Sequence, residues 1–383
     1  MSFVEDALKF HAEHNGMLAV ASKVPLNNRE DLALAYTPGV AEPCKAIKEN
    51  KELSFEYTCR GNTVAIVSDG TRVLGLGDIG PEAAMPVMEG KAVLFKTFGD
   101  VDAIPICIDT KDPEEIIETV RRLQPTFAGI NLEDFSSPKC YEIEDRLREI
   151  CDIPVFHDDQ HGTAIACLSA VMGALRYVKK DIKDVKVVVN GCGAAGSAIG
   201  RLFVSMGFPN VIMVERVGAL YKGIDAKLDK IQRYLSDVTN PNMEKGTLAE
   251  VAKGADILVG VSGPNLFTKE IIAGMADKAI VFGLANPVPE TSYEAAIAAG
   301  AAVAGTGRSD SPNQVNNVTV FPGVFRGAID VRARAINEEM KVAAVYAIAN
   351  LIDEKDLPVA AHLKIDGIRY HFFIKGMHFG LNR

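Results

Sequence analysis

The sequence has 383 residues, 48% of them hydrophobic and 24% charged, a composition typical of a globular protein with about two domains. Its net charge of -9 argues against a nucleic-acid or anionic-membrane surface, because both repel an acidic protein. No apolar run reaches the roughly 18 residues that span a bilayer, and the start, MSFVEDALKF, lacks the basic-then-apolar order of a signal peptide. We therefore expect a cytoplasmic protein. Its seven cysteines include no C-x-x-C pair, which argues against a disulfide framework or structural zinc.

The first part of the chain begins with a predicted helix over residues 3–14. In TVAIVSDGTRVLGLG, the pair Asp69-Gly70 lies between two apolar runs, and this pattern predicts a hairpin. Residues 81–99 open with proline and close with glycine, which predicts a helix although Gly90 interrupts it.

Strands and helices then alternate. The helices are predicted to begin after Asp112 and near Pro138, and the strands between them are DAIPICIDT, FAGINLED and PVFHDD. This βαβαβ order predicts a parallel sheet with right-handed crossovers. From Thr163 the pattern changes to one longer helix, whose apolar face carries Ile165, Leu168, Met172, Leu175 and Val178. We place a domain boundary there, which divides the chain into residues 1–163 and 164–383.

A second alternating series follows, with strands predicted near 186–190, 211–215, 257–261, 279–283 and 301–305. The stretch 324–352 is helical in period, and the tail ends in HFFIKGMHFGLNR. The predicted fold class is therefore α/β: an N-terminal α/β domain with a parallel sheet, and a C-terminal doubly wound domain of the Rossmann type.

The second series opens with a dinucleotide-binding pattern. In VKVVVNGCGAAGSAIGRLF, a strand leads through Gly191, Gly193 and Gly196 into a helix. These glycines would permit the tight turn, the approach of the pyrophosphate and close helix–strand packing. Glu215 ends the next strand, where an acid accepts the ribose hydroxyls and favours NAD, whereas Arg216 could instead pair with the 2′-phosphate of NADP. The other candidate cofactor residues are Ala194, Ala195, Ser262 and Asn286.

Two acidic pairs follow two predicted strands of the first series: Glu133-Asp134 and Asp158-Asp159. Because the carboxyl ends of parallel strands open onto one crevice, we expect these acids to converge. Such a cluster repels itself unless a cation lies within it, and oxygen ligands suit Mg²⁺ or Mn²⁺. The alternative is that each pair only begins the next helix, where acids are favoured.

Basic and polar residues complete the candidate site. Lys91 has apolar neighbours, which predicts a partly buried ammonium with a lowered pKa. Arg72 follows the predicted hairpin turn and could clamp a carboxylate. Asn286 and Asn317 flank apolar runs at the ligand edge of the second sheet, and Tyr36 precedes a Thr-Pro-Gly turn. Each could equally be an ordinary surface or packing residue.

Several sequence blocks occur together over most of the chain: YTPGVAEPC, TRVLGLGDIGPEAAMPVMEGKAVLFK, NLEDF, FHDDQHGTA, the glycine triplet, GLANPVPE and NNVTVFPGVFRGAID. In this order they resemble the malic enzymes, and the length is similar to the short bacterial and archaeal type. The segment VERVG departs from the family, since many short relatives carry an aspartate at that strand end. Cofactor preference therefore stays open, with NAD favoured over NADP.

The resemblance also implies residue roles. Tyr36 would be the general acid, Lys91 the general base and Asp158 the acid that supports the lysine. The implied metal ligands are Glu133, Asp134 and Asp159, and the implied malate-binding residues are Arg72, Asn286 and Asn317. A homodimer or larger homo-oligomer is also implied, in which Tyr36 could serve its own site or a neighbour's.

The expected function is oxidative decarboxylation of L-malate to pyruvate and CO2, with NAD or NADP and Mg²⁺ or Mn²⁺. Oxaloacetate decarboxylation would accompany it. The rival enzymatic interpretation is a malolactic-type or oxaloacetate decarboxylase activity without net cofactor reduction. A rival of another class is a sensor that binds a dinucleotide without turnover.

Overall fold

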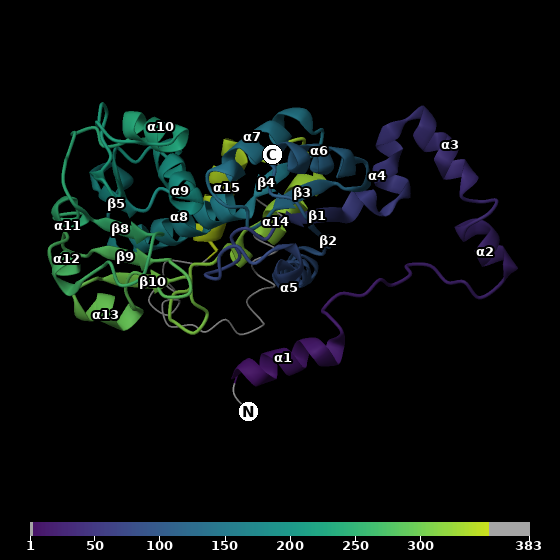
Figure 1. The fold of residues 1–383 in the computed structure, drawn as a ribbon, viewed down its shortest axis with the longest axis horizontal. Helices are drawn as coiled ribbons and strands as arrows, with labels where there is room; N and C mark the ends of the chain where they lie inside the picture. Colours follow the sequence, from purple (N-terminus) through teal and green to yellow (C-terminus); the bar gives the residue numbers. More distant parts are fainter. Residues whose placement is uncertain (1–2, 352–383) are drawn as a thin grey trace.

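Two sheets form the framework of the chain in this computed structural model, which describes residues 3–351 (Figure 1). The first sheet is parallel throughout and has the order β2-β1-β3-β4. Its strands are β1 Thr63–Ser68, β2 Asp102–Cys107, β3 Gly129–Leu132 and β4 Val155–His157. The connecting helices are α5 Pro81–Gly99, α6 Pro113–Leu123 and α7 Lys139–Ile150. The predicted βαβαβ order and the helix over 81–99 are confirmed.

The second sheet has the order β10-β9-β8-β5-β6-β7 and is parallel except for the β6–β7 pair. Its strands are β5 Lys186–Asn190, β6 Asn210–Glu215, β7 Gly218–Ala219, β8 Ile257–Gly260, β9 Ile280–Gly283 and β10 Val303–Thr306. Its helices are α9 Ala194–Ser205, α10 Lys230–Val238, α11 Leu248–Val251, α12 Lys269–Ala273 and α13 Tyr293–Ala298. The five predicted strands are confirmed. The order reverses at β5, which creates the crevice where such sheets bind ligands.

Helix α8 (Asp158–Val178) joins the two parts and packs against both α9 and α15. The prediction that this helix starts at Thr163 is wrong by five positions, because its first residues, Asp158 to His161, are polar and carry no apolar pattern. A β-carbon on Gly162 would lie 1.7 Å from the Asp158 carboxylate, so the helix needs a glycine at this position. The predicted domain boundary near residue 163 lies inside α8 and stays a prediction.

The last described elements are α14 (Phe321–Asp330) and α15 (Glu338–Ala349). The predicted helical stretch 324–352 is therefore interrupted between them, and the predicted helical tail lies outside the described residues. Phe321 and Phe325 of α14 contact Phe95 of α5, so this helix returns to the first sheet and closes the core there.

The predicted hairpin at Asp69-Gly70 is wrong. Strand β1 pairs with parallel strands on both of its edges, so the apolar run after Gly70 has no edge to join. It forms a loop instead, with one isolated antiparallel bridge between Val73 and Gly77. This loop leaves the carboxyl end of the sheet, which places Arg72 beside the end of β3.

An N-terminal arm precedes the first sheet and projects away from it (Figure 1). It contains α1 (Phe3–His14), as predicted, α2 (Arg29–Ala35) and α3 (Ala41–Glu49), before the short α4 (Ser54–Tyr57). None of its first three helices contains a buried residue. Over residues 3–351, no helix has the length and apolarity required to cross a membrane.

Candidate active site

Three carboxylates converge at the carboxyl ends of two neighbouring strands. Glu133 and Asp134 follow β3, and Asp159 stands in the first turn of α8, directly after β4. One oxygen from each of the three lies within 4.8 Å of the others. The Asp159 carboxylate also accepts the Asp134 backbone N–H at 2.8 Å, which fixes the two strand ends relative to each other.

The electrostatics of this cluster favour a cation. Burial and the charge of Asp159 raise the pKa of Asp134 to about 8, and burial raises that of Glu133 well above its usual range. Among the described residues, Asp134 Oδ2 is buried without a hydrogen-bond partner. An oxygen-only donor set with a spare buried oxygen fits a hard divalent ion such as Mg²⁺ or Mn²⁺.

Lys91 lies beside this cluster on α5 and is only 7% exposed. Its Nζ is 2.6 Å from Glu133 Oε2 and 2.5 Å from Asp158 Oδ2, and it lies 4.4 Å above the Phe321 ring. Burial acts to lower its pKa, but the charges of Asp158 and Glu133 outweigh burial and raise it. The predicted lowered pKa is therefore wrong, since the apolar neighbours in the sequence do not reveal the acids that meet Lys91 in space.

Asp158 connects Lys91 to the second half of the chain. Burial raises its pKa to about 6, against the opposing charge of Lys91. The Asn317 side-chain amide donates to Asp158 Oδ2 at 2.5 Å. Asp158 therefore receives two donors on one oxygen, which holds the lysine and the asparagine on either side of it.

Arg72 lies between the acids and the glycine loop. Its backbone N–H donates to the Asp134 carbonyl at 2.9 Å, and a β-carbon built on Gly193 would be 3.8 Å from its Nη1. Asn286 is exposed in the loop after β9. A β-carbon on Gly75 would be 2.3 Å from Pro287 Cδ, so the loop that carries Arg72 reaches the loop that carries Asn286.

The glycine loop joins β5 to α9 as the sequence predicts. Gly191 has a φ of 111°, and a β-carbon on Gly196 would lie 1.9 Å from the Gly191 carbonyl oxygen, so α9 packs directly on the turn. The Glu215 carboxylate accepts the Cys192 N–H at 3.2 Å, which places it against the loop. Ala194 is buried at the start of α9, and the remaining candidate cofactor residues, Ala195, Arg216 and Ser262, lie half-buried or exposed around it.

Tyr36 is not brought to these residues. It directly follows α2 on the N-terminal arm and is 69% exposed, and Figure 1 shows α2 well away from β3 and β4. Any contribution of Tyr36 to this chemistry therefore requires another copy of the chain or a movement of the arm.

Five residues that shape the candidate site were missed from the sequence: Asn131, Asp69, Thr71, Lys139 and Ser136. Asn131 donates to Glu133 Oε2 at 2.9 Å, and the same-face spacing of two residues on β3 was its only signal. Buried Asp69 accepts from the Thr71 hydroxyl at 2.6 Å and from Lys139. The Thr71 hydroxyl in turn accepts the Ser136 N–H at 3.0 Å, which ties the Arg72 loop to the segment after Asp134.

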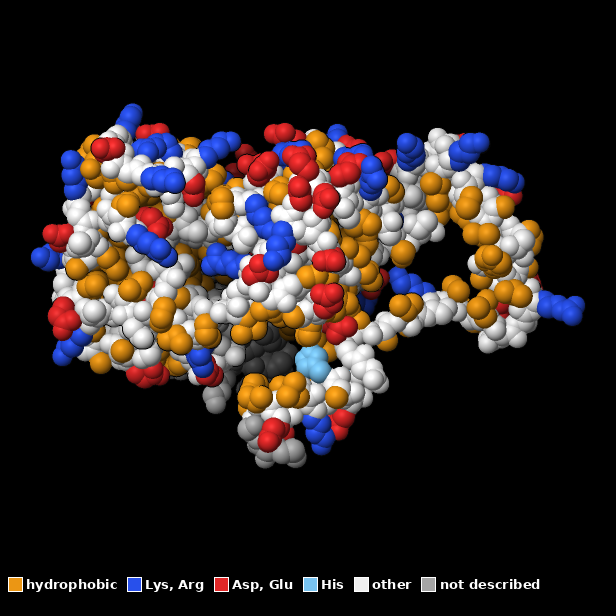
Figure 2. Space-filling model, in the orientation of Figure 1, with side chains coloured by type: hydrophobic (Ala, Val, Ile, Leu, Met, Phe, Trp, Pro, Cys, Tyr) orange, Lys and Arg blue, Asp and Glu red, His pale blue; other side chains and the backbone are white. Residues whose placement is uncertain are grey.

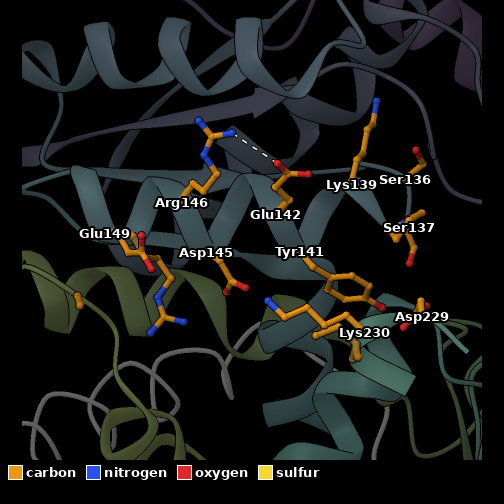
Figure 3. Close-up of a pocket in the computed structure, with 14 residues that line it drawn as sticks. Ser136, Ser137, Lys139, Tyr141, Glu142, Asp145, Arg146, Glu149, Asp229 and Lys230 are labelled. Atoms are coloured by element: carbon orange, nitrogen blue, oxygen red, sulfur yellow. Dashed lines mark hydrogen bonds and ion pairs between the residues drawn. The ribbon is translucent and has the colours of Figure 1, made fainter. Parts of the chain in front are cut away.

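A pocket of about 980 Å³ lies outside this cluster, between α7 and α10 (Figure 3). Tyr141 and Lys230 face each other across it, and Lys139, Asp145 and Asp229 lie along its walls. Its lining contains both signs of charge and none of the candidate catalytic, metal or cofactor residues. The candidate chemistry is therefore located at the strand ends and not in this pocket.

Comparison with known proteins places the chain in a family. Two family models match, the malic enzyme N-terminal domain over residues 15–148 and the malic enzyme NAD-binding domain over residues 160–369. A bifunctional malic/malolactic enzyme of Bacillus subtilis is 52% identical over 93% of this chain and 87% of its own length. An NAD-dependent malic enzyme of Geobacillus stearothermophilus is 53% identical over 89% of this chain and 71% of its own.

A solved structure also matches nearly the whole chain. The crystal structure of an NAD-dependent malic enzyme from Thermotoga maritima superposes with a TM-score of 0.91 at 45% identity, and covers 97% of this chain and 98% of that one. Both domains, their order and the carboxylate cluster between them lead to one conclusion: the chain belongs to the malic enzyme family.

Proposed function

We propose that this member of the malic enzyme family oxidises and decarboxylates L-malate to pyruvate and CO2, with Mg²⁺ or Mn²⁺ at Glu133, Asp134 and Asp159, and with NAD preferred over NADP. One observation supports this most directly: the Lys91 ammonium lies within 2.6 Å of both a metal-site acid and Asp158. A base next to a metal-bound alcohol is what the oxidation step requires.

The bound groups supply two kinds of chemistry. When bound, the cation is a Lewis acid that polarises the oxygen on C2 of malate, and the dinucleotide is the hydride acceptor. The residues of the chain position the substrate and move protons. Arg72 would bind a malate carboxylate through its guanidinium, and Asn286 and Asn317 would donate amide hydrogens to the carboxylate oxygens.

Lys91 would carry the first proton transfer. In the ion pair its ammonium is held protonated by Asp158 and Glu133. Glu133, Asp134 and Asp159 would hold the cation, and with the charge of Glu133 shared in this way the pKa of Lys91 would fall, so that Nζ would accept the C2 hydroxyl proton. After CO2 leaves, Nζ would return a proton to the oxygen, with Asp158 and Asn317 holding the amine in place.

The final proton would come from a second subunit, in a homodimer or a larger homo-oligomer. Tyr36 would protonate C3 of the enol while Lys91 Nζ takes back the hydroxyl proton, which leaves the ketone of pyruvate, but Tyr36 is 69% exposed on the arm. The arm also exposes a series of large apolar side chains (Figure 2): Phe3, Val4, Leu8, Phe10, Val20, Val24, Leu26, Leu32 and Leu34. Such a surface is typical of a subunit interface, so we propose that the arm covers a second copy and delivers Tyr36 there.

NAD is proposed over NADP because of Glu215. It ends β6 beside the glycine loop, where a carboxylate accepts ribose hydroxyls and repels a 2′-phosphate. Arg216 is exposed next to it and leaves NADP as the weaker alternative. The cytoplasmic location expected from the sequence also stays a prediction.

The decisive experiment measures initial rates with L-malate, each cofactor in turn, with and without Mn²⁺. We expect reduced nicotinamide and pyruvate in equal amounts, a higher kcat/KM with NAD and complete loss of turnover in excess chelator. Full activity in chelator would contradict the metal proposal. Binding of NADH without any turnover would support a sensor instead.

A second candidate activity is the malolactic conversion of malate to lactate without net cofactor reduction. It is favoured by one specific observation, the 52% identity to an enzyme named malic/malolactic. Product analysis separates the two activities, because lactate without accumulation of NADH would identify the malolactic reaction. Release of pyruvate from added oxaloacetate, without malate turnover, would identify a simple decarboxylase.

A further inference from the structure

Glu290 is a fully buried carboxylate at the ligand edge of the second sheet. It lies in the loop after β9 and is 0% exposed. Its Oε1 accepts the Ser262 N–H at 2.8 Å, and its Oε2 accepts the Ala285 N–H at 3.0 Å. One carboxylate therefore joins the two loops that carry the candidate cofactor and substrate residues Ser262 and Asn286.

The two bonds replace the strand pairing where β8 and β9 separate. The ladder ends at Gly260 opposite Gly283, with one further bond from the Leu284 N–H to the Gly260 carbonyl at 2.8 Å. A β-carbon on Gly260 would be 2.5 Å from Glu290 Cδ, so the carboxylate fills the space next to the strand end. The carboxylate therefore links the two loops and fixes the distance between them.

The contact also extends to the glycine-loop strand. The Asn190 side-chain amide, at the end of β5, donates to Ser262 Oγ at 2.8 Å. Asn190, Ser262, Glu290 and Ala285 thus form one connected series across the carboxyl ends of β5, β8 and β9. Glu290 lies seven residues past the end of β9, so no local sequence pattern connects it with the strand end.

We propose that Glu290 is the positioning residue that sets the distance between Ser262 and Asn286, and thereby shapes the site for the nicotinamide half of the dinucleotide and for malate. This inference rests on the proposed function for the identity of those ligands. Glu290 touches neither substrate nor cofactor and acts through the backbone of the two loops.

The chemistry of the side chain makes the idea testable. A carboxylate offers an acceptor oxygen to each N–H, whereas a glutamine of the same shape offers one acceptor and turns an amide N–H₂ toward the other donor. Glu290→Gln therefore breaks one of the two bonds with little change of volume. Glu290→Asp keeps both oxygens but is one methylene shorter, so it serves as a second variant if the glutamine variant does not fold.

The experiment measures NADH affinity by nucleotide fluorescence, KM for malate, and the affinity for Mn²⁺ alone. A hydrogen bond to a charged group that is lost from a buried site costs about tenfold or more in affinity. We expect Glu290→Gln and Glu290→Asp to raise the Kd for NADH and the KM for malate by that order. Mn²⁺ affinity should stay as in the wild type, because the acids belong to the other sheet.

The matched control is Glu294→Gln, the same chemical change at an exposed position of α13, which should change none of the three. The inference is overturned if the Glu290 variants lose thermal stability but keep the wild-type Kd for NADH and KM for malate, since Glu290 would then be purely structural. NADH binding needs no malate oxidation. A wild-type chain that binds NADH but leaves malate unoxidised would therefore refute the proposed function alone.

Discussion

Lys91 and Asp134 illustrate how burial changes the properties of single residues. Lys91 is held charged by two acids although it is buried. Asp134 is driven towards its neutral form by burial and by Asp159. Burial alone would favour a neutral Lys91, yet its neighbours keep it charged. Asp134 would be charged in water, yet its surroundings favour the neutral form. A divalent cation among the acids would change both pKa values in the direction that catalysis needs.

The first prediction concerns Lys91→Ala. A general base typically contributes about 10²–10⁴-fold, so kcat for malate oxidation should fall by that order. NADH affinity should remain, because the glycine loop is intact. The matched control is Lys96→Ala, which removes a largely exposed lysine from the same helix and should leave kcat unchanged. Near-normal malate oxidation in Lys91→Ala would remove the lysine from its assigned role.

The second prediction concerns Asp134→Asn, which should weaken Mn²⁺ binding and stabilise the metal-free protein. Asparagine tolerates the left-handed backbone of this position, where φ is 58°. The variant should need on the order of tenfold more Mn²⁺ for half-saturation, because it loses a charged ligand. Without metal it should unfold at a higher temperature than the wild type, and the difference should grow from about pH 4 to pH 8, because over this range the unfolded wild type releases the Asp134 proton that the folded chain keeps.

Mn²⁺ titrations followed by thermal unfolding measure both parts. The control is Asp237→Asn, an exposed acid of α10, which should change neither quantity. Unaltered Mn²⁺ affinity in Asp134→Asn would exclude Asp134 from the metal site.

Helices α8 and α9 carry candidate metal and cofactor residues in their first turns, so the placement of these two helices shapes the candidate site. The third prediction compares two glycine-to-alanine changes. In Gly196→Ala the new β-carbon meets the Gly191 carbonyl, so α9 must move from β5 and the Kd for NADH should rise by at least about tenfold. Gly173→Ala, within α8, meets nothing within 4 Å and should stabilise the fold by about 0.5–1 kcal/mol. Equal NADH affinity in the two variants would contradict the proposed role of the loop.

The fourth prediction concerns the pH dependence of stability at α8. His161 lies between Lys341 of α15, with Nδ1 3.0 Å from Nζ, and Glu144 of α7, with Nε2 2.8 Å from Oε1. Burial lowers the pKa of His161 to about 4. Below about pH 6.5 the unfolded chain therefore binds a proton that the folded chain does not. This contribution to stability is complete above pH 6.5 and is lost as the pH falls towards 4.

Urea unfolding between pH 7 and 4.5 measures this effect. His161→Gln should lower stability at pH 7 and flatten its dependence on pH. Some slope should remain, because burial also lowers the pKa of His157. His11→Gln, on exposed α1, should leave the slope of the wild type. An unchanged slope in His161→Gln would show that this histidine is not held neutral.

The sequence predicts where strands and helices lie more accurately than it predicts which residues meet in space. Alternation and the glycine triplet are local patterns, so the strands and the loop before α9 were predicted within a few residues. The pKa of Lys91 depends on acids from two other elements, which no local pattern contains. The false hairpin after β1 has the same origin, since the pairing of both β1 edges is decided by strands far along the chain.

At the scale of the whole molecule, the N-terminal arm carries a series of exposed large apolar side chains (Figure 2). The sequence could predict α1 but not its surroundings: the segment after it bonds to α5 through the Met17 N–H and Glu89 Oε2 at 3.1 Å, while Phe3, Val4 and Leu8 of α1 stay exposed. Tyr36 shares this property. Its proposed role follows from the family resemblance, whereas its exposed position follows from the fold, and the two agree if a neighbouring subunit receives Tyr36 or if the arm moves onto its own site.

The fifth prediction tests that agreement by mixing two impaired variants. In Tyr36→Phe and in Lys91→Ala homodimers every site is defective, and turnover of each should fall by about 10²–10⁴-fold. In a mixed dimer with Tyr36 acting across the interface, one site combines an intact Lys91 with an intact Tyr36, and the other site receives both defects. If Tyr36 acts within its own subunit, each site keeps one defect and activity does not return. The two variants are unfolded together and refolded. Recovery of malate oxidation would then indicate that Tyr36 serves the partner's site. The control for subunit exchange replaces Tyr36→Phe with Tyr57→Phe, a change at a half-exposed tyrosine of α4. Dimers that exchange subunits but stay inactive would place Tyr36 in its own site and would require the arm to fold back onto it.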